Sequence, residues 1–431
     1  MQSRSLAEET AREVSASDIA VGVIVGRSSE FFDFFVFAIA SVIVFPQRFF
    51  SFAPPLQATM WSFAVFALAF LARPFGTVLF TTIDRKFGKN AKLILALVLL
   101  GTSTVAVGLL PGYDVLGWWA IAGLAALRVG QGLALGGAWD GLASLLAINA
   151  PEGRRGFYAM VPQLGAPVGL IVAALLFAYL VGSLSAAEFL DWGWRYPFFV
   201  AFAINVVALF ARLRIVATPE YQRLFKGREL QPTTVAATVR AEGRTILAGA
   251  FVPLASFALF HMVTVFPLSW VFLYTNQSPV SFLLIESLGA VFGFAAILVS
   301  GWASDKVGRR TLLFWGALVI AVFSLLAPVL LGAGQTGEAM YMIYGFVILG
   351  FNFGQSSGAV AALFAPEHRY TASALVSDLA WLFGAGFAPL AALALAAWLG
   401  LFAAGFYLLS GAVGTMLALQ LAYRGGPRRS A

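Results

Sequence analysis

The 431-residue chain contains no cysteine and only two histidines, His261 and His368. Disulfides are therefore excluded, and so is a metal site built from cysteine and histidine. We expect no metal and no bound cofactor. Charged residues are also scarce, at 11% of the chain, whereas 60% is hydrophobic. A soluble domain of this length needs a more polar surface, so the composition indicates a membrane protein.

Long hydrophobic runs fill most of the chain. A helix that spans a bilayer needs about 20 mostly apolar residues. The runs do not alternate polar and apolar residues as the strands of a membrane barrel do. The sequence therefore predicts an all-α membrane protein with twelve transmembrane helices. The runs cover residues 18–45, 57–83, 91–110, 117–148, 157–182, 195–216, 246–274, 280–304, 311–332, 339–363, 370–396 and 399–423.

The basic residues are distributed unevenly between the two sides of these helices. The net charge is +7, and all but five of the 27 lysines and arginines fall in the tails and in alternate loops. This asymmetry follows the positive-inside rule and predicts a multi-pass protein of the inner (plasma) membrane with both termini cytoplasmic. We expect lipid and a small molecule as partners, and no nucleic acid. The five exceptions are Arg27, Arg48, Arg73, Arg128 and Arg195.

Two short motifs occur twice, about half a chain length apart. Lys86-Phe87-Gly88-Lys89 returns as Lys306-Val307-Gly308-Arg309, and Ala150-Pro151-Glu152 returns as Ala365-Pro366-Glu367. Two echoes at nearly one offset predict a duplicated membrane domain, and we expect a monomer. The predicted parts are a cytoplasmic tail (1–17), a six-helix bundle (18–216), a cytoplasmic linker (217–245), a second six-helix bundle (246–424) and a cytoplasmic C-terminal tail (425–431).

The segment Gly301–Arg310 resembles the loop signature of the major facilitator superfamily. Glu30–Phe34, Ala72–Gly76 and Arg128–Gly132 are similar to its metabolite:proton symporter branch, which includes carriers of α-ketoglutarate, shikimate, citrate and proline/betaine. The resemblance implies two pseudo-symmetric six-helix bundles that alternate access to a central site.

The resemblance also implies a gate at the basic turns. The copy in the first half departs from the signature, because Arg85 occupies the position of the acidic residue and Asp84 stands one place early. We therefore expect a rearranged network of charges in that half. The predicted gating residues are Asp84, Arg85, Lys89, Gly301, Asp305, Gly308, Arg309, Arg310 and Asp378.

Ionisable residues inside the membrane are costly and mark functional sites. Glu30 and Asp33 share a face of the first helix with Arg27, while Arg128 and Asp140 lie on the fourth. We predict that Arg128 lies near Glu30 or Asp33, and Arg27 near Asp140. Glu30, Asp33 and Asp140 are the candidates for proton coupling. The alternative is a static network that holds the two helices together.

Arg128 is the first candidate for binding an anion, because its planar guanidinium suits a carboxylate. Neutralising Asp33 is its alternative role. His261 is a candidate substrate ligand because it lies between Pro253 and Pro267, two prolines that are expected to kink its helix around a cavity. Its alternative role is packing. Near the outer end of helix 8, Glu286 is expected to reach water. The predicted substrate-binding residues are Arg27, Arg128, Gln131, His261, Asn352 and Gln355.

The function predicted from these residues is import of a small organic anion, a mono- or dicarboxylate, by symport with protons. Two alternatives stay open. One is a proton-driven efflux antiporter of drugs or metabolites, although Gly165–Leu170 matches the helix 5 motif of that class only in part. The other is a symporter of a zwitterionic compatible solute. An enzyme is not expected, because no nucleophile and base or set of metal ligands converges.

Overall fold

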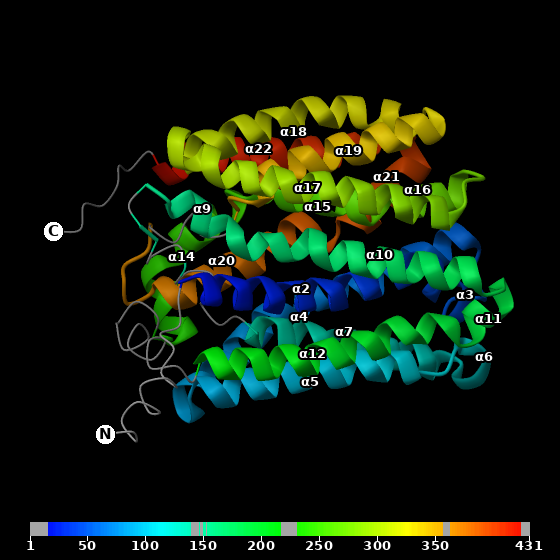
Figure 1. Ribbon diagram of the computed structural model, residues 1–431, viewed down its shortest axis with the longest axis horizontal. Helices are drawn as coiled ribbons and strands as arrows, with labels where there is room; N and C mark the ends of the chain where they lie inside the picture. Colours follow the sequence, from blue (N-terminus) through cyan, green and yellow to red (C-terminus); the bar gives the residue numbers. More distant parts are fainter. Residues whose placement is uncertain are drawn as a thin grey trace, which may run out of the picture.

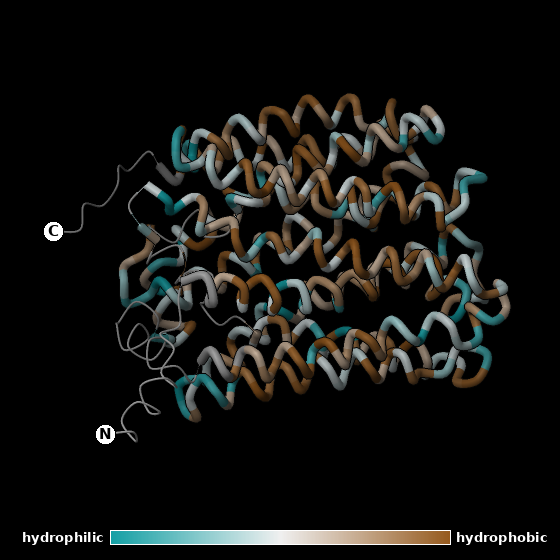
Figure 2. The backbone as a smooth tube through the Cα atoms, viewed as in Figure 1, coloured by the Kyte–Doolittle hydropathy of each residue, from teal (hydrophilic) through white to brown (hydrophobic). Residues whose placement is uncertain are grey.

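The computed structural model describes residues 16–138, 146, 150, 151, 153–216, 231–356 and 363–423. Within these ranges every regular element is a helix, and the long helices run along one common axis (Figure 1). Hydrophobic residues dominate their middle portions, and hydrophilic residues gather at the two ends (Figure 2). We call the end at which α2 begins and α22 finishes the inner end, following the predicted orientation.

The first half contributes six spanning segments, and the fifth of them is interrupted. A 3₁₀ turn, η1 (Val161–Leu164), separates α9 (Arg155–Met160) from α10 (Gly165–Ser183). The other five are α2 (Ala16–Ile43), α4 (Pro55–Phe87), α5 (Lys89–Leu109), α7 (Trp118–Gly137) and α12 (Tyr196–Val216). Short helices at the outer end are α3 (Phe45–Arg48), α6 (Tyr113–Leu116), α11 (Ala186–Asp191) and η2 (Gly193–Arg195).

The second half repeats this plan, with two interrupted segments. Its first spanning segment breaks at Val265, between α15 (Leu254–Thr264) and α16 (Phe266–Tyr274). Its fifth contains a π-helical stretch, η5 (Trp381–Gly386), between α20 (Arg369–Ala380) and α21 (Ala388–Leu399). The remaining segments are α17 (Pro279–Val307), α18 (Arg309–Leu331), α19 (Gly334–Phe353) and α22 (Leu401–Tyr423).

Ten segments of the described chain are long and apolar enough to cross a membrane. The other two spans are α2 and α19, of 28 and 20 residues, which pack within the same bundles. The prediction of an all-helical membrane protein with twelve spans is therefore confirmed.

The second part of the predicted linker is a helix, α14 (Val235–Phe251). Thr234 caps its N-terminus by accepting a hydrogen bond from the Ala237 amide at 3.3 Å. A stripe of buried residues that includes Thr238, Glu242 and Ile246 faces α20 and α22. The charged residues between these positions conceal the helix in a search for continuous hydrophobic runs.

Packing repeats between the halves as the duplicated motifs predict. The neighbours α4 and α7 correspond to α17 and α19, and α5 and α12 correspond to α18 and α22. The two basic turns also share one backbone geometry, with φ of 85° at Gly88 and 83° at Gly308. Glycine suits both positions because side chains disfavour positive φ.

The halves meet along two seams. In the first, α10 packs along α17. In the second, α4 contacts α20 and η5, and α16 contacts α2 and α4 nearer the outer end. The two halves are therefore in contact both near the inner end and near the outer end of the molecule.

Candidate functional site

A cavity of about 590 Å³, a volume that includes its mouth, lies between the two halves. It is lined by parts of α2, α4, α7 and η5, so three of its walls belong to the first half. Its charged lining residues are Arg27, Glu30, Arg73 and Arg128, and its aromatic ones are Phe31, Phe34, Phe70 and Trp381.

Arg128 is buried and held on several sides. Its guanidinium carbon lies 3.9 Å from the ring centroid of Phe37 and 4.7 Å from that of Phe66. Its Nε donates to the Phe66 carbonyl oxygen at 3.2 Å, and its Nη1 donates to Oε1 of Gln131 at 3.0 Å. Its buried Nη2 has no hydrogen-bond partner among the described residues. Arg128 lines the cavity and thus keeps one donor that no described residue satisfies.

Asp33 lies behind the cavity wall rather than in it. Thr104 Oγ1 is 2.8 Å from both of its carboxylate oxygens, and Asn205 Nδ2 donates at 2.8 Å. Gln131 Nε2 donates to Thr104 Oγ1 at 2.8 Å. Arg128 and Asp33 are thus linked through Gln131 and Thr104 and form no direct ion pair.

Arg27 and Glu30 form an ion pair within α2, one turn apart, with Nη1 and Oε2 separated by 2.5 Å. Glu30 is therefore not the direct partner of Arg128. Asp140, the predicted partner of Arg27, lies outside the described residues.

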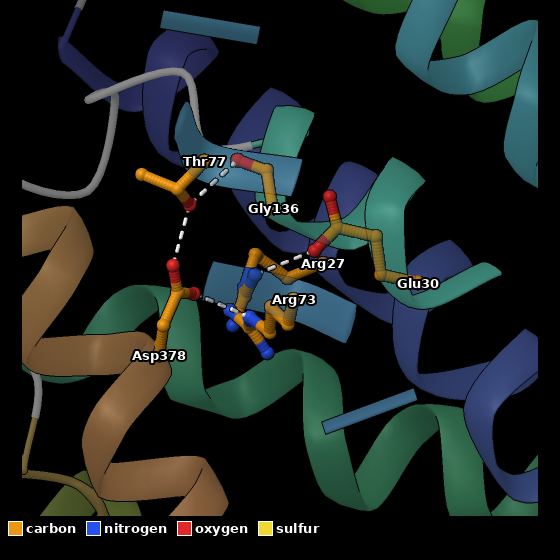
Figure 3. Close-up of polar contacts among 6 residues, drawn as sticks. All are labelled: Arg27, Glu30, Arg73, Thr77, Gly136 and Asp378. Carbon is orange, nitrogen blue, oxygen red and sulfur yellow. Dashed lines mark hydrogen bonds and ion pairs between the residues drawn. The ribbon is translucent and has the colours of Figure 1, made fainter. Parts of the chain in front are cut away.

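A second ion pair joins the two halves beside the cavity (Figure 3). Arg73 Nε lies 2.7 Å from Oδ1 of Asp378. The Thr77 hydroxyl donates to the other carboxylate oxygen and also lies 3.2 Å from the Gly136 carbonyl oxygen. Sequence reasoning assigned Asp378 to the gate but missed Arg73 and Thr77. The available signal was that Arg73 is one of the five basic residues outside the basic loops.

Glycines position Arg73 and Thr77 by bringing α4 and α7 together. A Cβ atom added at Gly136 would overlap the Arg73 carbonyl oxygen, and one at Gly132 would overlap the Ala69 carbonyl oxygen. Small residues at one helical spacing allow backbones to touch. This contact fixes α4 on α7, and with it the side chains that reach α20.

His261 does not line the cavity. Its ring stacks on Phe34 with centroids 5.4 Å apart, and it meets the edges of Phe66 and Phe70 at 5.3 and 5.8 Å. Its Nε2 has no hydrogen-bond partner among the residues that the structure describes. An aromatic layer therefore separates this predicted substrate ligand from the cavity.

Asn352 and Gln355 do not line this cavity in this conformation, and their role as substrate ligands stays a prediction. Asn352 donates to the Ile348 carbonyl oxygen at 2.9 Å and faces Gly316 of α18. Gln355 donates to the Gly156 carbonyl oxygen at 3.2 Å and accepts from Arg309 Nε at 3.3 Å. Spacing of one turn identifies a shared face but not the direction in which that face points.

At the inner end, Asp305 joins the second half to the start of α9. Its carboxylate oxygens accept from the Gly156 and Phe157 amides at 2.6 and 3.1 Å, at a helix N-terminus that favours negative charge. Gly301 permits this approach, because an added Cβ would lie 2.7 Å from Cγ of Met160. The structure thus brings these two predicted gating residues to one inter-half contact.

The first half uses different residues at the corresponding place. Asp84 pairs with Lys92 at 3.6 Å, and Lys92 donates to the Tyr370 hydroxyl of α20 at 2.9 Å. Lys89 lies over the ring of Tyr370 at 5.7 Å. Arg85 is exposed. Lys92 and Tyr370 were not predicted, because nothing in the altered signature identifies them.

Glu286 is fully buried, so the expectation that it reaches water is wrong. It lies two turns into α17 from Pro279, and neither carboxylate oxygen has a hydrogen-bond partner among the described residues. Among all the residues that the structure describes, no group of three or more His, Cys, Asp or Glu side chains is arranged to hold a metal ion.

Comparison with known proteins agrees with this architecture. A family model of the Major Facilitator Superfamily matches residues 23–389. The inner membrane metabolite transport protein YhjE of Escherichia coli K12 is 35% identical, covering 95% of this chain and 94% of that protein. The shikimate transporter of the same strain is 28% identical and covers 87% of each chain.

Solved structures show the same fold. The proton:xylose symporter XylE superposes with a TM-score of 0.72 over 95% of each chain, at 18% identity. The relatives are transport proteins, which confirms the prediction that the chain is not an enzyme. The chain belongs to the major facilitator superfamily, in its metabolite:proton symporter branch, and is a multi-pass membrane transporter.

Proposed function

We propose that the protein imports a small organic anion, a mono- or dicarboxylate, by symport with protons and alternating access of its two halves. The observation that carries this proposal is the Nη2 atom of Arg128, a buried donor without a hydrogen-bond partner among the described residues of the cavity wall. Guanidinium groups bind carboxylates through such nitrogens.

The charges around the cavity support the proposal that the substrate is an anion. Arg27 is paired with Glu30, and Arg73 with Asp378, whereas Arg128 has no ion-pair partner within 4.0 Å among the described residues. The guanidinium of Arg128 is therefore the group that an anionic ligand can pair with. Its aromatic side chains suit the hydrocarbon body of an organic acid. A relative named as a shikimate transporter is consistent with a carboxylate cargo.

Buried carboxylates support coupling to protons. Glu30 lies in the cavity wall, and Asp33 is linked to Arg128 through Gln131 and Thr104. A proton on either group changes the charge that Arg128 experiences. We keep Glu30, Asp33 and Asp140 as the proposed proton-coupling residues, with the proton gradient as the energy source.

We further propose that the protein is a monomer of the inner membrane with both termini cytoplasmic. The basic turns at Gly88 and Gly308 lie at the inner end, as the positive-inside rule requires. The contacts of Asp305 and Lys92 between the halves then close the cytoplasmic side in this conformation.

Uptake of a panel of labelled carboxylates into proteoliposomes tests the proposal, with and without an inward proton gradient. We expect the gradient to drive accumulation of at least one acid. Arg128→Ala should abolish its binding, and Glu30→Gln should reduce the dependence on the gradient. Arg48→Ala, at an outer ion pair 3.7 Å long with Asp114, is the matched control.

Three other outcomes contradict the proposal. If no carboxylate is taken up under any gradient, the anion assignment is wrong. Accumulation of betaine instead would favour the zwitterion symporter. Loss of a preloaded compound on imposing the gradient would favour the efflux antiporter.

A further inference from the structure

We propose that Arg73 is a second anion-binding subsite of the cavity, which Asp378 occupies while the carrier is empty. A proton taken up by Asp378 releases Arg73, and the carboxylate of the substrate then binds there. This inference rests on the proposed function and gives it a coupling step between proton and anion.

Arg73 is accessible to a ligand, whereas Asp378 is set back from the cavity. Arg73 lines the cavity wall, and its guanidinium carbon lies 5.9 Å from the ring centroid of Trp381. Its ion pair with Asp378 uses Nε, and no other acceptor for this guanidinium is found among the described residues. Its two terminal nitrogens are therefore available to a carboxylate in the cavity.

The surroundings of Asp378 form a carboxylate-binding site. One oxygen accepts from Arg73 Nε, and the other accepts from the Thr77 hydroxyl (Figure 3). Both donors belong to α4 in the first half, and the carboxylate belongs to α20 in the second. The Asp378 carboxylate of the second half thus occupies an anion-binding site that the first half builds next to the cavity.

The contact with Gly136 lets Asp378 accept a proton without leaving a buried polar group unsatisfied. When Asp378 is neutral, its hydroxyl can donate to the oxygen of Thr77. The hydrogen of Thr77 then turns to the Gly136 carbonyl oxygen, which already lies 3.2 Å away. Each donor keeps an acceptor, as buried groups require. One proton enters, and one positive charge on Arg73 becomes available for one negative charge of the substrate.

The other basic groups around Asp378 are paired with carboxylates of the first half, and Lys92 also donates to the Tyr370 hydroxyl of α20 at 2.9 Å. Arg27 pairs with Glu30 on α2, and Lys92 pairs with Asp84. Arg128 on α7 belongs to the same cavity wall. The carboxylate of Asp378 differs from those of Glu30 and Asp84 because its ion pair joins the two halves. Its protonation therefore changes both the charge of the cavity and the contact that holds the halves together.

The test uses the absence of native cysteine and needs no substrate. A single cysteine is introduced in the cavity wall as Leu135→Cys. Its labelling rate is measured with two methanethiosulfonate reagents, an anionic sulfonate and a cationic trimethylammonium. The ratio of the two rates removes the effect of thiol ionisation and reports the electrostatic potential of the cavity.

We expect the anionic-to-cationic ratio to rise about threefold or more between pH 8 and pH 5.5, because protonation exposes the charge of Arg73. Asp378→Asn should give a high ratio already at pH 8, with a smaller pH response than the parent. The double variant Arg73→Gln/Asp378→Asn, which leaves no unpaired charge that impairs folding, should give a low ratio at both. Asp114→Asn, at an exposed outer carboxylate, should behave like the parent.

A parent ratio that does not change with pH overturns the inference, and so does a pH response in Asp378→Asn as large as that of the parent. Glu30→Gln, measured beside it, removes the contribution of the other carboxylate in the cavity wall. The labelling result is separate from the uptake test. Failure of every carboxylate in the panel, together with the expected labelling pattern, would reject the proposed cargo and leave the anion subsite in place. Uptake of a carboxylate together with a labelling ratio that does not change with pH would reject the coupling step and leave the proposed cargo in place.

Discussion

Arg128 is prepared for a ligand by the groups that hold it. Two rings enclose its guanidinium, and two of its nitrogens bind Phe66 and Gln131, so Nη2 is presented in a fixed position. Lysine carries the same charge but not the planar fork. We expect Arg128→Lys to raise the KM for the transported acid about tenfold, because the variant loses one charged hydrogen bond to the substrate. Uptake kinetics in proteoliposomes measure this, and an unchanged KM would show that charge alone suffices.

Asp33 depends on the donors that surround it. Thr104→Val removes one donor from this buried carboxylate, and we expect a destabilisation of about 1–3 kcal/mol. Thermal unfolding in detergent should show a lower Tm. Thr102→Val is a matched control on the same helix, because its exposed hydroxyl bonds only carbonyl oxygens of α5. Equal changes in the two variants would contradict a special role for the Asp33 network.

Glu286 presents the opposite case, a buried carboxyl group without a hydrogen-bond partner among the described residues. Its desolvation opposes folding by about 1–3 kcal/mol. Glu286→Met, which has similar volume and no polar oxygen, should therefore raise the Tm. A lower Tm would mean that the carboxyl group makes a stabilising interaction in another conformation.

Among the elements, the two basic turns offer an internal comparison. An added Cβ meets nothing within 4 Å at Gly88 or at Gly308, so steric overlap does not contribute. Alanine at either position suffers only from the backbone conformation, in which positive φ combines with ψ of 167° or 142°, at a cost of about 1–3 kcal/mol. We expect Gly88→Ala and Gly308→Ala to lower the Tm by similar amounts. Clearly unequal losses in the same unfolding assay would argue that the two turns are not structural equivalents.

The spanning elements were largely predictable from the sequence, because bilayer thickness and loop charge constrain them strongly. Their interruptions were less so. Pro253 and Pro267 predicted the irregular first helix of the second half, whereas nothing indicated the π-helix at Trp381–Gly386. Within that stretch Gly384 lies against Phe257 and Gly386 against Phe70, neighbours that come from other parts of the chain.

At the scale of the whole molecule, transport depends on the free-energy difference between conformations with the inner end closed and with it open. Asp305 binds the first amides of α9 across the halves, so Asp305→Asn weakens closure of the inner end by about 1 kcal/mol. We expect a cysteine at the buried Met160 to label about fivefold faster from the inner side in this variant. Asp114→Asn is the control, and an unchanged rate would remove Asp305 from the gate.

The charged residues of the site were predictable, but their partners were not. Arg27, Glu30 and Arg128 were identified because charges are rare inside a membrane. Their pairing depends on helix rotation, in which one residue turns the side chain by about 100°. The same uncertainty hid the contact between Arg73 and Asp378, which only the docking of the two halves creates.

The ion pair between Arg73 and Asp378 has a consequence for membrane voltage. The empty carrier holds Arg73 against an ionised Asp378, and the loaded carrier holds it against the substrate anion while Asp378 is neutral. The pair is thus uncharged overall in both forms. Moving one charge through the membrane field involves about 2.3 kcal/mol per 100 mV, and a neutral pair avoids this term in both directions. Symport of one proton with a monoanion through this pair then moves no net charge, so the pH difference drives it and the membrane potential does not.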